Sequence, residues 1–158
     1  MKVTKASVIY ALLCNIPVSA CLCLAANFSN NNGNIIWNEF LLNYAVSLPV
    51  AILISLFVPL VGLGKWFTGL FGVENETFTH NILYRILAIL FTSFIYFMIL
   101  NPVLAVFNSL ISGVWIDIPV WVFHWMRSLP GMLAVGFLSS LFFDIPAFRI
   151  AHKVDPNF

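Results

Sequence analysis

Four long apolar stretches dominate the chain and constrain what it can fold into. They cover residues 7–26, 40–63, 84–107 and 120–143. Each is at least as long as the ~20 residues that a helix needs to cross the ~30 Å hydrocarbon core of a bilayer. Because a backbone in lipid must satisfy its hydrogen bonds internally, only helices and closed barrels span membranes. The sequence therefore predicts an all-α membrane protein with four transmembrane helices in one domain, residues 1–158.

The composition excludes a soluble globule and a nucleic-acid-binding protein. Of the 158 residues, 61% are hydrophobic and only 8% are charged, whereas a soluble domain is about 25% charged. Seven Lys and Arg residues stand against six Asp and Glu residues. There is no basic stripe that could neutralise a phosphate backbone. The partner that the composition predicts is the lipid bilayer.

The positions of the basic residues predict the orientation in the membrane. If the N-terminus is cytoplasmic, Arg127 alone of the seven Lys and Arg residues lies towards the outside. The other six then share the cytoplasmic side, as the positive-inside rule requires; they are Lys2, Lys5, Lys65, Arg85, Arg149 and Lys153. We expect a multi-pass protein of the inner or plasma membrane, with both termini and residues 64–80 cytoplasmic. Residues 27–38 and 109–119 are expected outside.

The first apolar stretch has a second interpretation. Lys2 and Lys5, the apolar run and the sequence Val-Ser-Ala-Cys at residues 18–21 resemble a bacterial lipoprotein signal with Cys21 as the lipidated residue. Cleavage would remove this helix from the mature protein. The apolar run continues beyond Cys21 to Ala26, which favours a retained helix, and both interpretations stay open.

The two halves of the chain resemble each other. The sequence Tyr-Ala-Val-Ser-Leu-Pro at residues 44–49 matches Trp-Met-Arg-Ser-Leu-Pro at residues 125–130. Both elements fall in the second apolar stretch of their half. Since each half would cross the membrane twice, the halves are predicted to be parallel helical-hairpin repeats. The first repeat covers residues 1–72 and the second covers residues 80–158.

This tandem hairpin, with basic residues at the N-terminus and an aromatic-x-x-Ser-Leu-Pro element in each half, resembles the small bacterial membrane family called domain of unknown function 2798. The resemblance covers nearly the whole chain. It implies the four-helix topology and a bacterial inner-membrane location, and it supplies no activity and no catalytic residues. Asn15, Cys21 and Cys23 have no counterpart in that pattern.

Small residues recur at four-residue steps along the first two stretches. Residues four apart lie on one helix face, and small-xxx-small faces favour close packing of helices in lipid. We therefore expect these two faces to pack against protein; the alternative is that they line a polar cavity. The predicted packing residues are Ser7, Ala11, Asn15, Ser19 and Cys23 in the first stretch and Ser47, Ala51 and Ser55 in the second.

Every apolar stretch contains a proline in its middle part, where it removes a helical hydrogen bond and favours a kink. These prolines are Pro17, Pro49, Pro102 and Pro130. Pro59 and Pro146 come near the ends of the second and fourth stretches. Residues 60–71 and 147–154, which follow them, are predicted to be short amphipathic segments at the inner interface. Asp144 is predicted to cap the second of these segments.

Catalytic chemistry is not expected. The chain has no HExxH, GxSxG or P-loop motif, and no carboxylate pair at catalytic spacing on one helix face. Three cysteines crowded into the first apolar stretch are typical of packing rather than of a disulfide framework or a metal site. The predictions are no enzyme, no cofactor and no metal.

Polar residues in the outer halves of the stretches suggest a binding site. Arg127 lies about seven residues into the fourth stretch, with His124 one turn away. Glu39 and Asn43, at the outer end of the second stretch, and Asn101 are expected nearby. An Arg fork binds carboxylate or phosphate in two-point contact, and Glu39 is expected to pair with Arg127 in the empty pocket. In the alternative, Arg127 binds no ligand and points outwards into the headgroup layer.

These features predict a small membrane protein that binds or translocates a small anionic or zwitterionic ligand between its two halves. The alternative is an accessory or scaffold protein that acts through a membrane-protein partner, or as a homo-oligomer. Transport requires polar groups that face the interior, whereas a scaffold requires an exposed surface for its partner.

Overall fold

The computed structural model describes residues 4–73 and 82–155, and these residues are almost entirely helical. Four helices are long and apolar enough to cross a membrane: α1 (Lys5–Asn30), α2 (Trp37–Phe57), α4 (Ile82–Ser112) and α5 (Ile118–Val154). A fifth and shorter helix, α3 (Leu60–Gly69), connects α2 towards α4. The described residues contain no strand. The prediction of an all-α protein with four transmembrane helices is confirmed.

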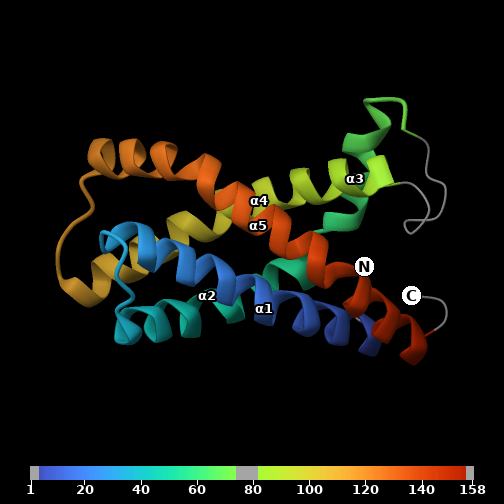
Figure 1. The fold of residues 1–158 in the computed structure, drawn as a ribbon, viewed down its shortest axis with the longest axis horizontal. Helices are drawn as coiled ribbons and strands as arrows, with labels where there is room; N and C mark the ends of the chain where they lie inside the picture. Colours follow the sequence, from blue (N-terminus) through green and yellow to red (C-terminus); the bar gives the residue numbers. More distant parts are fainter. Residues whose placement is uncertain (1–3, 74–81, 156–158) are drawn as a thin grey trace.

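The two hairpins run in the same direction. Helices α1 and α4 both begin at one end of the bundle, and α2 and α5 return to it (Figure 1). We call this the termini end, because Lys5 and Val154 lie there, and we call the opposite end the loop end, because residues 31–36 and 113–117 turn there. Around the bundle, α1 packs between α2 and α5, and α4 packs against α5 and α3 and less extensively against α2.

The second helix ends earlier than its apolar run predicted. The stretch 40–63 was expected to be one span, but α2 ends at Phe57 and α3 begins at Leu60. Pro59 is the physical reason, since it lacks the N–H that would continue the helix and favours extended backbone before it; Val58 is extended, with φ −86° and ψ 127°. Much of the predicted segment 60–71 is therefore a separate helix.

Helix α3 packs tightly on the first turns of α4. A Cβ atom placed on Gly64 would lie 3.3 Å from the Cβ of Ala88, so the two helices approach closely at this point. The rings of Phe67 and Phe91 stack with their centroids 4.2 Å apart. This contact fixes α3 to the termini end of the second hairpin (Figure 1).

The prediction that the fourth span exits at Pro146 into a separate segment is wrong. Helix α5 continues through Pro146 to Val154. The lost hydrogen bond is tolerated because Ala147 and Ala151 are buried, 2% and 0% exposed, and α5 packs extensively on α1 in this bundle. Asp144 is consequently not a helix cap. It lies in the middle of a helix, and its carboxylate contacts other helices.

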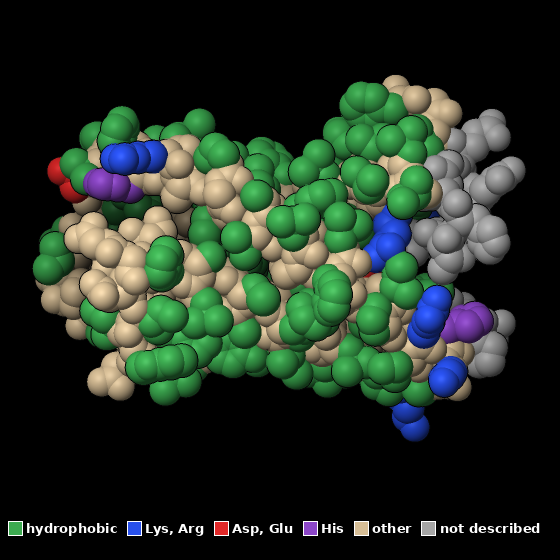
Figure 2. Space-filling model, in the orientation of Figure 1, with side chains coloured by type: hydrophobic (Ala, Val, Ile, Leu, Met, Phe, Trp, Pro, Cys, Tyr) green, Lys and Arg blue, Asp and Glu red, His purple; other side chains and the backbone are tan. Residues whose placement is uncertain are grey.

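The outer surface has the character that a bilayer requires. Large apolar side chains are exposed on all the long helices, and Figure 2 shows hydrophobic side chains over most of the visible face. Lys and Arg side chains on this face gather at the termini end, and one lies at the loop end (Figure 2). The structure thus supports a multi-pass membrane protein. Lys2 and residues 74–80 of the predicted cytoplasmic connection lie outside the described residues.

Candidate functional site

A large cavity runs along the inside of the bundle between α1, α2, α4 and α5. Its volume is about 1360 Å³, and all four long helices contribute to its lining. Asp144 lines it towards the termini end and Arg127 lines it towards the loop end. These residues are 17 positions apart on α5, which corresponds to roughly 25 Å at the helical rise per residue. The cavity is therefore long enough to pass through much of the membrane core.

A polar cluster crosses the interior between three helices. Asn15 on α1 donates from Nδ2 to Ser55 Oγ on α2 at 2.7 Å and to the carbonyl of Ala11 at 2.7 Å. The Tyr96 hydroxyl on α4 lies 3.1 Å from Asn15 Oδ1 and 3.0 Å from the carbonyl of Ala51. It also contacts Ser55 Oγ. Every polar atom of this cluster has a partner, so we interpret it as a structural link between α1, α2 and α4.

A second cluster, at the termini end, contains an ion pair between two of the long helices. Arg85 Nε on α4 lies 3.5 Å from Asp144 Oδ2 on α5, and both side chains are almost buried. The Tyr10 hydroxyl on α1 donates to Asp144 Oδ1. Arg85 Nη2 also donates to the carbonyl of Leu141 at 2.5 Å. Buried charges inside a membrane are costly unless paired, and they mark functional sites.

The predicted packing residues lie on the interior side of their helices. In α1, Ala11, Asn15, Ser19 and Cys23 are buried and Ser7 is half-buried. In α2, Ser47 and Ala51 are buried and Ser55 is half-buried. Cys23 Sγ lies 3.1 Å from Ser47 Oγ, which places the two faces against each other. Several of these side chains also line the cavity, so one face serves both of the roles that the sequence left open.

The structure brings four of the five predicted ligand-binding residues to one cavity. Asn43, Asn101, His124 and Arg127 all line it. His124 and Arg127 are exposed, whereas Asn43 and Asn101 are half-buried. Arg127 and His124 therefore lie where the cavity opens, which we call its mouth, and the two amides are less exposed.

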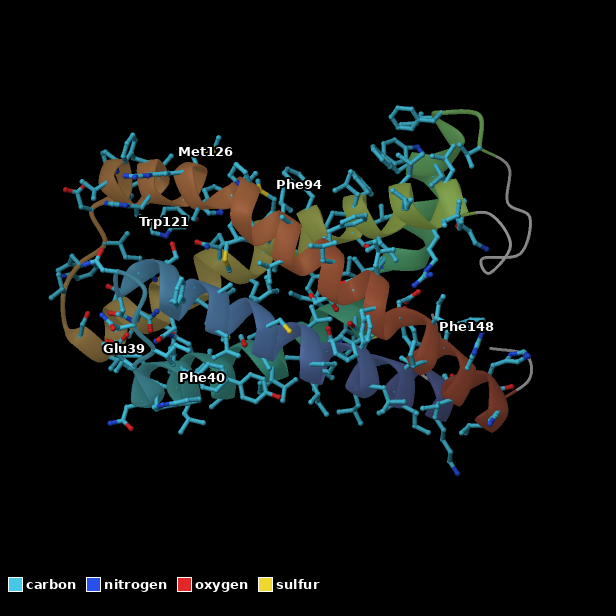
Figure 3. The ribbon with its side chains drawn as sticks, in the orientation of Figure 1. Glu39, Phe40, Phe94, Trp121, Met126 and Phe148 are labelled. Atoms are coloured by element: carbon cyan, nitrogen blue, oxygen red, sulfur yellow. The ribbon has the colours of Figure 1, made fainter. Side chains whose placement is uncertain are left out.

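Glu39 does not join this set, and the expectation that it pairs with Arg127 is wrong. Its carboxylate accepts hydrogen bonds from Asn31 Nδ2 at 2.9 Å and from Asn27 Nδ2 at 3.4 Å. The reason is local: Glu39 is in the first turn of α2, beside the turn that joins it to α1 (Figure 3). The side chain of Asn27 also bonds both the N–H and the carbonyl of Ile36. Glu39 thus belongs to the connection between α1 and α2.

Two buried polar atoms on the cavity wall towards the loop end have no hydrogen-bond partner. They are Oδ1 of Asn43, an acceptor on α2, and Nε1 of Trp125, a donor on α5. Asn43 lies six residues into its helix from the loop end and Trp125 lies seven, so both are roughly 10 Å deep by the helical rise. A buried polar group without a hydrogen bond costs about 1–3 kcal/mol. These atoms require water or a ligand inside the cavity.

Aromatic side chains form one wall of the same region. Trp121 and Trp125 stack with their ring centroids 5.3 Å apart, and Trp125 also stacks on Phe97 of α4 at 6.2 Å. Figure 3 shows Trp121 on the bundle side of α5 and Met126 on the opposite side. The stack holds the Trp125 ring in place and leaves its N–H as the free polar edge.

Tyr10, Arg85 and Tyr96 were not predicted as site residues, and Asp144 was predicted only as a helix cap. A signal was present for Asp144, because an acidic residue in or next to an apolar span is a functional candidate by default. Arg85 was counted only as a positive-inside charge. Tyr10 and Tyr96 carry no signal of their own, because each gains its role from a partner far away in the sequence.

The described residues contain no group of three His, Cys, Asp or Glu side chains that could hold a metal ion.

The matched Ser-Leu-Pro elements have a common local geometry. Ser47 Oγ donates to the carbonyl of Tyr44 at 3.5 Å, and Ser128 Oγ donates to that of Trp125 at 3.0 Å. Helical serines commonly bond a carbonyl of the preceding turn, so this shared geometry does not by itself test the repeat. The internal repeat stays a prediction.

Comparisons of the chain with protein-family models, with curated proteins and with solved structures found no match. The resemblance to the family of domain of unknown function 2798 therefore stays a prediction that rests on the tandem hairpins and the two Ser-Leu-Pro elements.

Proposed function

We propose that this protein binds a small amphipathic ligand with an anionic or zwitterionic head in the cavity between its hairpins. The observation that carries the proposal is the pair of unpartnered polar atoms, Asn43 Oδ1 and Trp125 Nε1, on the wall of a cavity whose mouth holds Arg127. An anionic oxygen of a ligand head would accept from Trp125 Nε1, and a hydroxyl of the ligand or a water molecule beside it would donate to Asn43 Oδ1.

The charge at the mouth selects the sign of the head group. Arg127 and His124 lie there, and Glu39 is held elsewhere by the asparagines of the α1–α2 turn. No carboxylate of the described residues lines this end of the cavity. A guanidinium binds carboxylate or phosphate through two parallel hydrogen bonds. The head group is therefore one that presents an anionic oxygen.

The deeper part of the cavity indicates that the ligand also has an apolar body. Below the mouth, Leu22, Phe97, Leu100 and Leu104 line the wall. Binding sites for small molecules are mostly apolar, with a few polar groups that fix orientation. A hydrophilic ion alone would leave this surface uncovered, whereas a single-chain amphiphile would cover it.

The proposed location is the inner or plasma membrane, with the termini end in the cytoplasm. This orientation is supported by the basic residues, of which Lys5, Lys65, Arg149 and Lys153 fall at the termini end and Arg127 falls at the loop end, in agreement with the positive-inside rule. The ligand would then reach the mouth from the outer side. In the alternative scaffold function, the cavity would be filled by lipid or water with no preference for the head group.

Native mass spectrometry in mild detergent tests the proposal. The wild-type protein should release an adduct of defined mass, and delipidated protein should bind palmitate or lysophosphatidylcholine as the anionic and zwitterionic probes. Arg127→Gln and Trp125→Phe should each weaken probe binding at least tenfold. Arg149→Gln removes an exposed arginine at the termini end and should bind as the wild type does. Equal binding by Arg127→Gln and Arg149→Gln would exclude the site.

A further inference from the structure

The buried cluster of Tyr10, Arg85 and Asp144 is not used by the ligand site at the loop end. We propose that the Asp144 carboxylate is a proton-binding site, and that its protonation opens the termini end of the cavity to water. The inference goes beyond the proposed ligand and does not depend on it. It would make the cavity accessible from both ends under the control of one proton.

The cluster joins three helices at a single carboxylate. Asp144 on α5 receives a hydrogen bond from Tyr10 on α1 at Oδ1 and faces Arg85 on α4 at Oδ2. The side chain of Asp144 is 6% exposed and that of Arg85 is 12% exposed. Asp144 and Tyr10 both line the cavity. The carboxylate therefore links the two hairpins at the end of the cavity.

The link to α4 is electrostatic rather than a hydrogen bond. Arg85 Nε and Asp144 Oδ2 are 3.5 Å apart, and each lacks a hydrogen-bond partner. The attraction between them depends on the full negative charge of the carboxylate. It is strong because the surroundings exclude water. Loss of that charge removes the attraction and leaves no directional bond between these two atoms to replace it.

Of the groups in this cluster, we expect Asp144 to be the one that changes its charge. Tyr10 and Cys14 face it from α1, and Arg85 faces it from α4. Lys65 of α3 is exposed, as are Arg149, His152 and Lys153 further along α5. Arg stays protonated at every pH that a protein survives. Among the described residues, Asp144 is thus the buried acidic group whose charge can change the cluster.

The proton step balances without any other reactant. A proton from the aqueous phase at the termini end forms an O–H bond at Oδ2 and converts the carboxylate to a neutral acid. Arg85 keeps its charge and its hydrogen bond to the carbonyl of Leu141. Helix α4 is then held to α5 at this level only by packing and by that one hydrogen bond. Because α4 packs less extensively on α2, we expect the opening on that side of α4.

A native cysteine provides the reporter. Cys14 lies one turn from Tyr10 on α1 and lines the cavity between the two polar clusters. In a protein with Cys21→Ala and Cys23→Ala, Cys14 is the single thiol of the chain. The rate of its modification by a small water-soluble methanethiosulfonate, measured in nanodiscs across a range of pH, reports the access of water to the termini end.

The rate of Cys14 modification, relative to that of Asp144→Asn at the same pH, should rise at least tenfold when the sample is acidified. The comparison at equal pH is needed because the reactive species is the thiolate, whose fraction falls on acidification. Asp144→Asn mimics the protonated acid. In this variant the rate of Cys14 modification should be high at every pH and should change only with the fraction of thiolate. Arg85→Gln removes the partner charge and should behave in the same way, so it serves if Asp144→Asn does not fold. Glu39→Gln removes an exposed carboxylate at the loop end and should keep the wild-type profile.

A rate ratio that stays constant across the pH range would overturn the proposal, because the thiolate fraction alone would then explain the change in rate. A rise on acidification that persists in both Asp144→Asn and Arg85→Gln would also overturn it, because a different group would then control the opening. Neither result bears on the ligand site at the loop end, since the assay contains no palmitate or lysophosphatidylcholine.

Discussion

The hydroxyl of Tyr96 on α4 lies 3.1 Å from the side-chain oxygen of Asn15 on α1. The same hydroxyl is 3.0 Å from the carbonyl of Ala51 on α2. A phenol has one proton and donates to one acceptor at a time, so the two oxygens share it. This single atom connects three of the four long helices, and among them are α2 and α4, which pack on each other less extensively than the other neighbouring helices do.

Removal of that hydroxyl should destabilise the bundle. Tyr96→Phe keeps the ring and leaves the Asn15 and Ala51 oxygens without their donor. We expect a loss of about 0.5–2 kcal/mol in the free energy of unfolding, the range for buried hydrogen bonds in membrane and soluble proteins. Thermal unfolding in detergent, followed by circular dichroism, measures it. Tyr44→Phe removes an exposed hydroxyl that donates to Ile16 at 3.2 Å and should cost less; an equal loss would contradict the three-helix role.

The number and type of the membrane spans could be predicted from the sequence because lipid imposes length and apolarity on each span. The ends could not be predicted equally well. Apolarity continues past Phe57, but Pro59 ends α2 there, whereas Pro146 fails to end α5. The difference is tertiary: buried alanines follow Pro146 in a helix that packs on α1. A proline by itself does not say which outcome will occur.

In the candidate site, too, some features could be predicted from the sequence and others could not. The residues around Arg127 could be placed on one cavity because their depths follow from counting along each helix. Glu39 was placed wrongly because the asparagines of the α1–α2 turn are closer to it in the sequence and capture its carboxylate. The pair of Arg85 and Asp144 spans two helices and 59 positions of sequence. No periodicity within either helix reveals such a partnership.

Bulk on the interior face of α2 should be tolerated poorly. Ala51 is 2% exposed, so Ala51→Leu must force α2 away from its neighbours, at a cost of about 1–3 kcal/mol. Ala45, on the same helix, is exposed, and Ala45→Leu adds the same atoms on the lipid side. We expect a lower unfolding temperature for Ala51→Leu and little change for Ala45→Leu. Equal unfolding temperatures of the two variants would contradict the assignment of this face to the interior.

Two glycines of α3 should respond oppositely to alanine. Glycine in a helix costs about 1 kcal/mol relative to alanine. A Cβ on Gly62 has only an ordinary contact, 3.9 Å from Pro59 Cβ, whereas one on Gly64 lies 3.3 Å from Ala88 Cβ. Gly62→Ala should therefore slow amide hydrogen exchange across α3, and Gly64→Ala should speed it relative to Gly62→Ala by pushing α3 off α4. The reverse order would show that α3 does not pack closely on α4.

The proposed orientation predicts which end of the bundle is accessible from outside the cell. Asn34 lies in the turn at the loop end and Lys153 lies in the last turn of α5 at the termini end, and both are exposed. In a chain whose native cysteines are replaced by alanine, Asn34→Cys should react with a membrane-impermeant maleimide added to intact cells. Lys153→Cys should react only after the cells are permeabilised, because six of the seven basic residues keep that end in the cytoplasm. Labelling of Lys153→Cys in intact cells, with protection of Asn34→Cys, would invert the topology and place the mouth at Arg127 on the cytoplasmic side.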